Sequence, residues 1–251
     1  MDKIIKIFQV TFPLLYFFLI WQALSVIGVL NPQFIPSPVE IVKKFFELML
    51  QNNFAIDILQ SVKRVLIGFI VAGVFGIISG IVCGMYKQVY NSLNPIIEIF
   101  RPIPPIAWTP LAILWFGLGD SPAFFLVFLG AFFPIFTNTY LGISSLDEIY
   151  RRAAFSLGSS RKLFITDVLI PSALPNIFAG LKIGLGVGWM VVIIAEMVGA
   201  QSGLGYMIQL NRIILEIPGV IVGMITIGCI GFVMNKFMVS LESLLIPWKQ
   251  K

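Results

Sequence analysis

The sequence predicts an all-α membrane protein that crosses the bilayer several times. Hydrophobic residues make up 58% of the 251-residue chain and charged residues only 12%, and the mean hydropathy is +0.97. This composition is typical of polytopic membrane proteins rather than of soluble domains. A helix needs ~20 apolar residues to cross ~30 Å of hydrocarbon, so the apolar stretches predict about six transmembrane helices. These stretches lie at 10–29, 65–85, 96–118, 122–141, 177–198 and 220–241.

The composition also argues against several classes of chemistry. The chain contains no histidine, which removes the commonest acid–base catalyst and the commonest zinc ligand. Cys83 and Cys229 lie far apart within apolar runs, which favours core packing over a disulfide framework or a metal pair. We therefore expect no catalytic residue, no metal site and no enzyme activity in this chain. The net charge of +5 is better explained by basic residues at membrane ends than by nucleic-acid binding.

The first 60 residues predict one transmembrane helix and an amphipathic segment. Lys3 and Lys6 precede an apolar run without an A-x-A site after it, which favours a retained span; a cleaved signal peptide is the alternative. The sequence Ser37-Pro38-Val39-Glu40 is typical of a helix start. The residues after it predict a helix along the outer membrane surface, with a solvated connector as the alternative. Its apolar face comprises Ile41, Val42, Phe45, Phe46, Leu48 and Met49, and its polar face Lys43, Lys44 and Glu47.

Glycines recur at every fourth position in the second and fifth predicted spans. Small residues at this spacing form a groove that allows another helix to approach closely. The pattern predicts tight packing within one subunit, with packing across a dimer axis as the alternative. The glycines are Gly76, Gly80 and Gly84 in the second span, and Gly180, Gly184 and Gly188 in the fifth.

Prolines interrupt the third apolar stretch. Pro102, Pro104, Pro105 and Pro110 are too closely spaced for a continuous helix. Irregular backbone at membrane depth is tolerated only where protein buries it or water reaches it. We therefore expect the segment 100–110 to lie beside a translocation path.

Ionisable side chains within spans are costly to bury and therefore mark functional candidates. Arg101 is a candidate cationic point on an anion path, with pairing to Glu98 as the alternative. Glu196 would repel an anion, so a structural or gating role is expected for it. We expect Lys182 and Lys236 to extend toward the membrane interface. The candidate path residues are Arg101, Pro104, Trp108 and Glu196.

The distribution of lysine and arginine predicts the orientation of the chain. With the N-terminus inside, the inner loops carry more of these residues than the outer loops. This places both termini and the segment Tyr150–Pro175 in the cytoplasm. The inner set is Lys3, Lys6, Lys87, Arg151, Arg152, Arg161, Lys162, Lys249 and Lys251, and the outer set is Lys43, Lys44, Lys63, Arg64 and Arg212.

The polar segment Tyr150–Pro175 predicts two short helices between the fourth and fifth spans. The stretch from Arg151 to Ser156 is compatible with a helix, which Gly158 ends. A second helical stretch runs from Ser160 to Ile170. Pro171 and Pro175 are expected to end it.

This segment resembles the cytoplasmic loop of ABC importer permeases, whose pattern is E-A-A, three residues, G, nine residues and I-x-L-P. Ala153-Ala154, Gly158 and Val168-Leu169-Ile170-Pro171 match that spacing. Arg152 replaces the acidic residue, which puts in doubt a salt bridge from this position to a partner. An ordinary helical hairpin is the alternative. FRPIPPIAWTPLAILWFGLGD at 100–120 and the stretch 189–205 also resemble permeases of the nitrate, sulfonate, taurine and bicarbonate group.

The resemblance implies the type I ABC importer permease fold and its organisation. Residues 1–60 would hold the first transmembrane helix and the outer segment, 61–245 the permease core with a coupling loop at 142–176, and 246–251 a cytoplasmic tail. The chain would form the translocation path for a small solute, expected to be an oxyanion (nitrate, sulfonate or taurine, or bicarbonate), by alternating access. The coupling-loop residues would be Arg151, Arg152, Ala153, Ala154, Gly158, Arg161 and Pro171.

Partners are implied as well. The chain lacks the G-x-x-x-x-G-K-[ST] motif, so we expect it to bind no cofactor, and ATP and Mg to be used by partner subunits. The resemblance implies two ATPase subunits, a second permease copy, an extracytoplasmic substrate-binding protein and the lipid of a bacterial plasma (inner) membrane. A homodimer is expected, with a paired paralogue as the alternative. The rival interpretation is a transporter or channel driven by an ion gradient, which would need paired broken helices in both halves.

Overall fold

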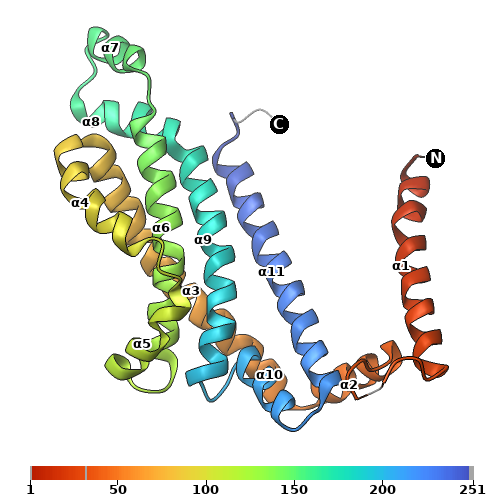
Figure 1. The fold of residues 1–251 in the computed structure, drawn as a ribbon. Helices are drawn as coiled ribbons and strands as arrows, with labels where there is room; N and C mark the ends of the chain where they lie inside the picture. Colours follow the sequence, from red (N-terminus) through yellow and green to blue (C-terminus); the bar gives the residue numbers. More distant parts are fainter. Residues whose placement is uncertain (1, 32, 249–251) are drawn as a thin grey trace.

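The computed structural model describes residues 2–31 and 33–248, and the elements within this part of the chain are helices (Figure 1). Apart from the 3₁₀-helix η1 and the π-helix η2, they are α-helices. In chain order they are α1 (Asp2–Val26), α2 (Pro38–Leu50), α3 (Asn52–Met85), α4 (Lys87–Phe100), η1 (Pro105–Trp108), α5 (Thr109–Phe116), α6 (Asp120–Ser144), α7 (Glu148–Ser156), α8 (Arg161–Phe164), η2 (Ile165–Leu169), α9 (Ile170–Gly199), α10 (Leu204–Ile213) and α11 (Ile217–Leu245).

Four stretches of helix within the described residues are long and apolar enough to cross a membrane. They are Asn53–Met85, Asp120–Ser144, Arg161–Gly199 and Ile217–Leu245. Two shorter apolar stretches, Leu15–Val26 and Pro105–Phe116, correspond to the first and third predicted spans. The predicted interruption of the third span is present, because η1 and α5 replace a continuous helix there. The structure therefore confirms the predicted all-helical membrane fold.

Helix α6 lies at the centre of the bundle, with α3 on one side and α9 on the other. A Cβ atom added at Gly80 of α3 would come within 2.6 Å of Thr139 Cβ on α6. On α9, a Cβ atom at Gly180 would come within 2.8 Å of Asn138 Cβ. Contacts this short exclude any side chain larger than hydrogen without displacement of the partner helix. The glycine stripes of the second and fifth predicted spans thus both face α6 of the same chain.

Helix α2 begins as the sequence predicts. Ser37 Oγ accepts a hydrogen bond from the Glu40 backbone N–H at 3.3 Å, and Glu40 Oε2 accepts one from the Ser37 N–H at 2.7 Å. This reciprocal pair is a capping box. Ile41 and Leu48 are buried, and α2 packs against α11. Helix α3 begins at Asn52, within the predicted segment 1–60, and Phe54 is already buried in the core.

The loop between α6 and α9 contains the predicted first helix but not the predicted end of the second. Helix α7 ends at Ser156, and Gly158 adopts a φ of +81°, a value that glycine reaches without a Cβ penalty. The prediction that Pro171 and Pro175 end the second helix is wrong, because α8, η2 and α9 form one helical stretch. In η2 the Ile170 N–H bonds to the Ile165 carbonyl, five residues back. This wider turn changes the hydrogen-bond register just before Pro171, whose missing N–H is then tolerated.

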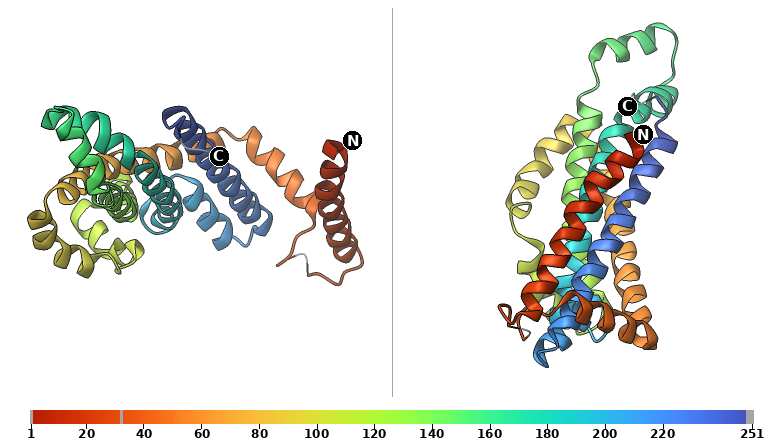
Figure 2. Two further views of the ribbon diagram at one scale, coloured as in Figure 1. Left: turned by 90° about the horizontal axis from the view of Figure 1, so that it is seen from above. Right: turned by 90° about the vertical axis from the view of Figure 1, so that its right-hand side faces the viewer.

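The two ends of the molecule carry different elements. Figure 1 shows α7 and α8 at one end, together with the start of α1 and the end of α11, and α2, α5 and α10 at the other. We call these the α7 end and the α10 end. Figures 1 and 2 show α1 standing apart from the other membrane-spanning helices. Near its C-terminus α1 contacts α2: Trp21 packs against the core cluster to which α2 contributes, and Gln22 Oε1 accepts a hydrogen bond from the Val39 N–H.

Some residues used in the orientation prediction lie outside the described part of the chain. The side chains of Lys3 and Lys6 are among them, as are residues 249–251 at the end of the predicted cytoplasmic tail, with Lys249 and Lys251.

Candidate functional site

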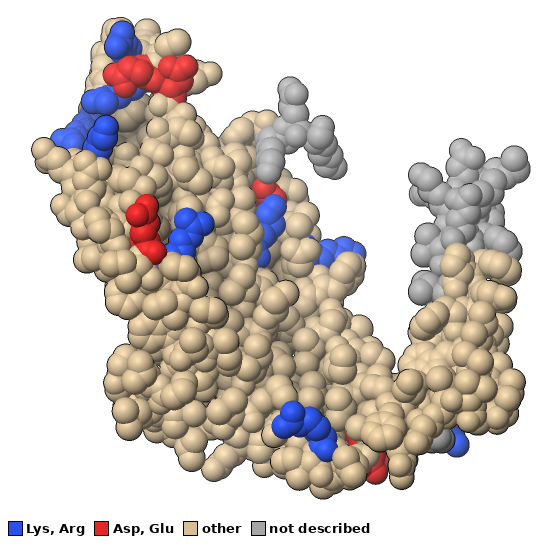
Figure 3. Space-filling view, in the orientation of Figure 1, with Lys and Arg blue, Asp and Glu red and all other residues tan. Residues whose placement is uncertain are grey.

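Helix α7 and the residue after it expose both apolar and charged side chains. Ile149 and Tyr150 are exposed, and Leu157 just after the helix is 88% exposed. Arg151 and Arg152 are also exposed, and each lies within 4 Å of Glu148, at 3.6 and 3.8 Å. Figure 3 shows basic and acidic side chains gathered at the α7 end of the molecule. This mixed surface is typical of a helix that another protein contacts.

The opposite side of α7 is tied to the bundle by a small cluster. The Phe155 ring lies 5.3 Å from that of Phe164, which is buried beside Ile143 and Leu169. Ala154 is half-buried at the edge of this cluster, whereas Ala153 is exposed. Because Phe164 lies on α8, which continues into α9, a displacement of α7 would be transmitted to a membrane-spanning helix.

The proline-broken segment lines a groove of about 330 Å³ on the side of α6 and α9. Arg101, Pro105, Asn138 and Val187 are among its lining residues. The predicted path residues Pro104 and Trp108 are close by but do not line it; the Trp108 ring packs 5.8 Å from Phe100 and against the core.

Arg101 does not pair with Glu98 in this structure. Glu98 instead accepts a hydrogen bond from Asn94 Nδ2 at 2.8 Å. Within the described residues no carboxylate lies in ion-pair distance of Arg101, so its charge is available to the groove.

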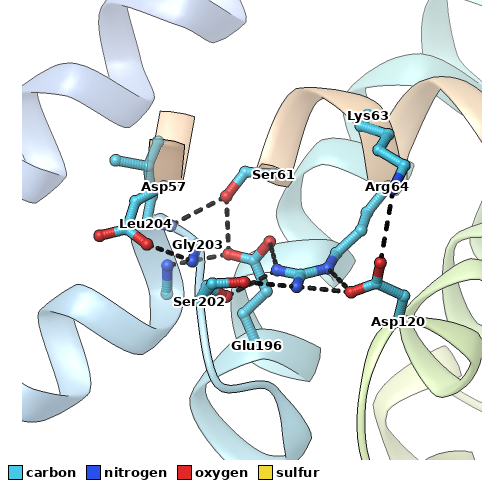
Figure 4. Close-up of polar contacts among 10 residues, drawn as sticks. Asp57, Ser61, Lys63, Arg64, Asp120, Glu196, Ser202, Gly203 and Leu204 are labelled. Carbon is cyan, nitrogen blue, oxygen red and sulfur yellow. Dashed lines mark hydrogen bonds and ion pairs between the residues drawn. The ribbon is translucent and has the colours of Figure 1, made fainter. Parts of the chain in front are cut away.

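Glu196 lies away from this groove, in a buried ion-pair network at the α10 end (Figure 4). Its carboxylate is 0% exposed and lies 2.8 Å from Nη1 of Arg64, which is 2% exposed. Nη2 of Arg64 contacts Asp120 Oδ1 at 2.6 Å. The network therefore joins α9, α3 and the start of α6 through one guanidinium group.

The same network holds the turn between α9 and α10. Ser61 Oγ donates to Glu196 Oε2 at 2.8 Å and accepts from the Leu204 N–H at 2.9 Å. Arg64 Nη1 donates to the Ser202 carbonyl at 2.6 Å, and Asp57 Oδ1 accepts from the Gly203 N–H at 2.7 Å. A Cβ atom at Gly203, whose φ is +109°, would overlap the Glu196 carboxylate. We call these residues, with Glu196 and Asp120, the outer network.

The outer network is arranged to hold helices together rather than to bind a solute. Both Glu196 oxygens accept hydrogen bonds, and the Arg64 guanidinium donates to two carboxylates and to Ser202. Buried charges are tolerated when they are paired in this way. The predicted role of Glu196 as a structural or gating residue fits this geometry, whereas a place on an anion path beside Arg101 does not.

Sequence reasoning misses Arg64 and the partner of Lys182. Because Arg64 directly precedes an apolar run, the sequence assigns it to the outer-loop charges. The sequence does contain a signal for a buried cation. Glu196 is expected within a span, and a carboxylate buried there requires a cation at the same depth. Lys182 is expected to extend to the interface, but its Nζ lies 2.7 Å from Glu242 Oε2 on α11.

No cluster of three or more metal-ligating side chains occurs within the residues that the structure describes.

Comparison with known sequences gives a consistent set of relatives. A family model described as "Binding-protein-dependent transport system inner membrane component" matches residues 72–251. The taurine transport system permease protein TauC of Escherichia coli (strain K12) is 35% identical over 234 residues, covering 91% of this chain and 85% of TauC. The putative aliphatic sulfonates transport permease protein SsuC of Bacillus subtilis (strain 168) is 35% identical, covering 92% of this chain and 83% of SsuC. The nitrate import permease protein NrtB of Synechocystis sp. is 34% identical, covering 86% of this chain and 82% of NrtB.

Solved structures share the fold. A chain from the crystal structure of an amino acid ABC transporter with histidines matches with a TM-score of 0.62 and 20% identity, covering 82% of this chain and 96% of that one. At this identity the likeness concerns the arrangement of helices.

Proposed function

Since the chain belongs to the family of binding-protein-dependent ABC importer permeases, we propose that it forms the translocation path for a small oxyanion. Its relatives include permeases named for taurine, aliphatic sulfonates and nitrate. A sulfonate or nitrate is therefore the proposed solute class, with bicarbonate as a further candidate. Arg101 supports this choice, because it is an exposed cation on the groove beside the broken segment.

One observation carries the proposed mechanism: α7 is exposed, and its Phe155 ring contacts Phe164 on α8, which continues into α9. The chain has no phosphate-binding P-loop, so ATP would be hydrolysed by separate subunits. We propose that α7 docks on such a subunit through Ile149, Tyr150 and Leu157, with Arg151 and Arg152 beside them. Movement of the ATPase would then displace α8 and the continuous helix behind it.

The isolated position of α1 supports a second permease copy. Its exposed side chains from Leu15 to Ile20 contact little of their own bundle. The groove at Arg101 is also open on the surface of one chain, whereas a translocation path must be enclosed. We propose that two copies of this chain, with two ATPase subunits, enclose the path between them.

The proposed orientation places the α7 end in the cytoplasm of a bacterial cell and the chain in its plasma membrane. The first residues of α1 and the last residues of α11 lie at this same end, which supports two cytoplasmic termini (Figure 1). The α10 end would then face the substrate-binding protein. There the outer network would hold α3, α6 and α9 in register while that protein delivers the solute.

The docking role is tested by charge reversal in α7. The variant with Arg151→Glu and Arg152→Glu, and separately Gly158→Pro, should reduce copurification of the companion ATPase and its substrate-stimulated hydrolysis of ATP. The matched control is Arg212→Glu, an exposed cation on α10 at the opposite end, which should leave docking unchanged. Normal assembly and hydrolysis in both loop variants would contradict the proposal. Uptake into vesicles without any ATPase would favour the rival gradient-driven mechanism.

The solute class is tested on the companion binding protein. Calorimetric titration with taurine, an alkanesulfonate, nitrate and bicarbonate should identify one tight ligand among these four solutes, each of which carries an oxyanion group. Binding only of a solute that lacks a sulfonate, nitrate or carbonate group would overturn the oxyanion assignment.

A further inference from the structure

A cavity of about 730 Å³ lies between α7 and the membrane-spanning helices. Its lining comes from the coupling loop on one side and from the ends of α3, α4 and α6 on the other. None of its lining residues belongs to the groove at Arg101. It is therefore a separate site, and its volume falls within the range of about 300–1,000 Å³ that ligand pockets occupy.

Cations from both sides face this cavity. Lys87 contributes from the start of α4, and Arg151 and Arg161 contribute from the loop. Glu148 is the acidic residue of the lining, and it lies 3.6 Å from Arg151. Within the described residues neither Lys87 nor Arg161 has a carboxylate at ion-pair distance. The cavity thus holds two cations whose charge no side chain offsets.

Neutral hydrogen-bonding groups surround these cations. Arg161 Nη2 donates to the Tyr86 hydroxyl at 3.1 Å, and its Cζ lies 5.9 Å from the centre of that ring. The contact holds the guanidinium, which lines the cavity, while its other N–H groups remain able to donate. Tyr90 and Tyr140 stack with ring centres 4.1 Å apart, and both line the cavity with Asn91.

Helices α3 and α4 meet at Tyr86, directly before Lys87. Tyr86 is the N-cap residue of α4 and makes no side-chain cap hydrogen bond. The first N–H groups of a helix lack partners within it and carry partial positive charge. Tyr86 is also the C-cap residue of α3, whose last carbonyls carry partial negative charge. The attraction for an oxyanion therefore comes from the Lys87 and Arg161 side chains.

We propose that this cavity binds a phosphate-like oxyanion that bridges α4 and the coupling loop. The oxyanion would contact Lys87 on the bundle side and Arg161 on the loop side, and so restrain α7 relative to α4. Two sources share this chemistry: a free oxyanion of the cytoplasm, and the headgroup of an anionic phospholipid. The proposal goes beyond the import function and does not require the ATPase, because the ligand would bind to the permease chain itself.

Two experiments distinguish these sources. The first, the free-anion arm, uses the full chain in neutral detergent. Inorganic phosphate is titrated at constant ionic strength with chloride as the reference, and the midpoint of thermal unfolding is followed. We expect a rise that saturates with phosphate, and an affinity reduced roughly tenfold by Lys87→Gln or Arg161→Gln, as for the loss of one charge-assisted hydrogen bond. Lys162→Gln is the matched control: it removes the same charge from the same loop, but Lys162 does not line the cavity.

The lipid arm uses the same variants. The chain is exchanged into bilayer discs of phosphatidylcholine with a trace of labelled phosphatidylglycerol, and retained label is measured after purification. Retention that falls severalfold in the Lys87 and Arg161 variants, but not in the Lys162 variant, would identify the headgroup as the source. Selective loss in either arm supports the site. Loss of equal size in all three variants, or absence of binding in both arms, would overturn it.

Discussion

The charged side chains at the two ends of this permease differ in burial and in pairing. At the α10 end, Arg64 and Glu196 are buried and paired, and the surrounding hydrogen bonds are supplied by the chain itself. At the α7 end, Arg151 and Arg152 are exposed and only loosely paired with Glu148. The difference indicates that the buried charges at the α10 end are paired within one chain, whereas the charges at the α7 end are exposed and available to the proposed ATPase partner.

The largest expected effect comes from removing the central cation of the outer network. Arg64→Ala leaves Glu196 buried without its partner, and breaking a buried pair in this way costs about 3–5 kcal/mol of stability. The measurement is the free energy of unfolding in detergent. The control is Lys63→Ala: Lys63 is half-exposed at 3.7 Å from Asp120, and such a surface pair contributes about 0–1 kcal/mol. Similar losses in the two variants would mean that the network does not hold the α10 end together.

A smaller effect is expected from a substitution in the glycine stripe of α3, which packs against α6. At Gly84 an added Cβ would lie 2.5 Å from Ile143 Cγ2, so Gly84→Val should destabilise the chain by about 1–3 kcal/mol through overpacking. Gly186, on α9, has open space around it, since a Cβ added there would meet no atom within 4 Å. Gly186→Ala should therefore be neutral, or stabilising by up to about 1 kcal/mol. If Gly84→Val were tolerated like Gly186→Ala, α3 and α6 would be less closely packed than the structure shows.

The smallest effect on global stability is expected in the coupling loop. Gly158 has a φ of +81° and no neighbour within 4 Å of an added Cβ, so Gly158→Ala costs only the backbone penalty of about 1–2 kcal/mol. Because the loop has few contacts, we expect this cost to appear as faster proteolysis near residue 158 rather than as a lower unfolding temperature. Ser159→Ala serves as the neighbouring control. A fall in unfolding temperature as large as that of Arg64→Ala would show that both ends belong to one rigid unit.

Local sequence patterns predict the elements of this fold well. Hydropathy locates the long spans, the capping box locates the start of α2, and the proline cluster locates the break between α4 and α5. Gly158 marks the end of the first loop helix in both the sequence and the structure. Each of these features depends on residues that are close together in the sequence.

The features that the sequence does not predict depend on distant partners or on a change of helical register. Arg64 and Glu196 are 132 positions apart, so no local pattern links them, and Arg64 resembles a loop charge. Lys182 and its partner Glu242 are 60 positions apart. The sequence predicts that Pro171 ends a helix, because the π turn that accommodates this proline in the structure has no clear sequence signal. Of the candidate path residues, Arg101 lines the groove, whereas Glu196 lies in the outer network. The path itself stays a prediction.

The most direct test of this account is the accessibility of α7 in oriented vesicles. Ser156→Cys is introduced into a Cys229→Ser background, since Cys83 is buried, and treated with a membrane-impermeant maleimide. The account predicts labelling in inside-out vesicles only, and protection when the companion ATPase is bound. Labelling from the exterior side, or labelling that the ATPase does not change, would contradict it.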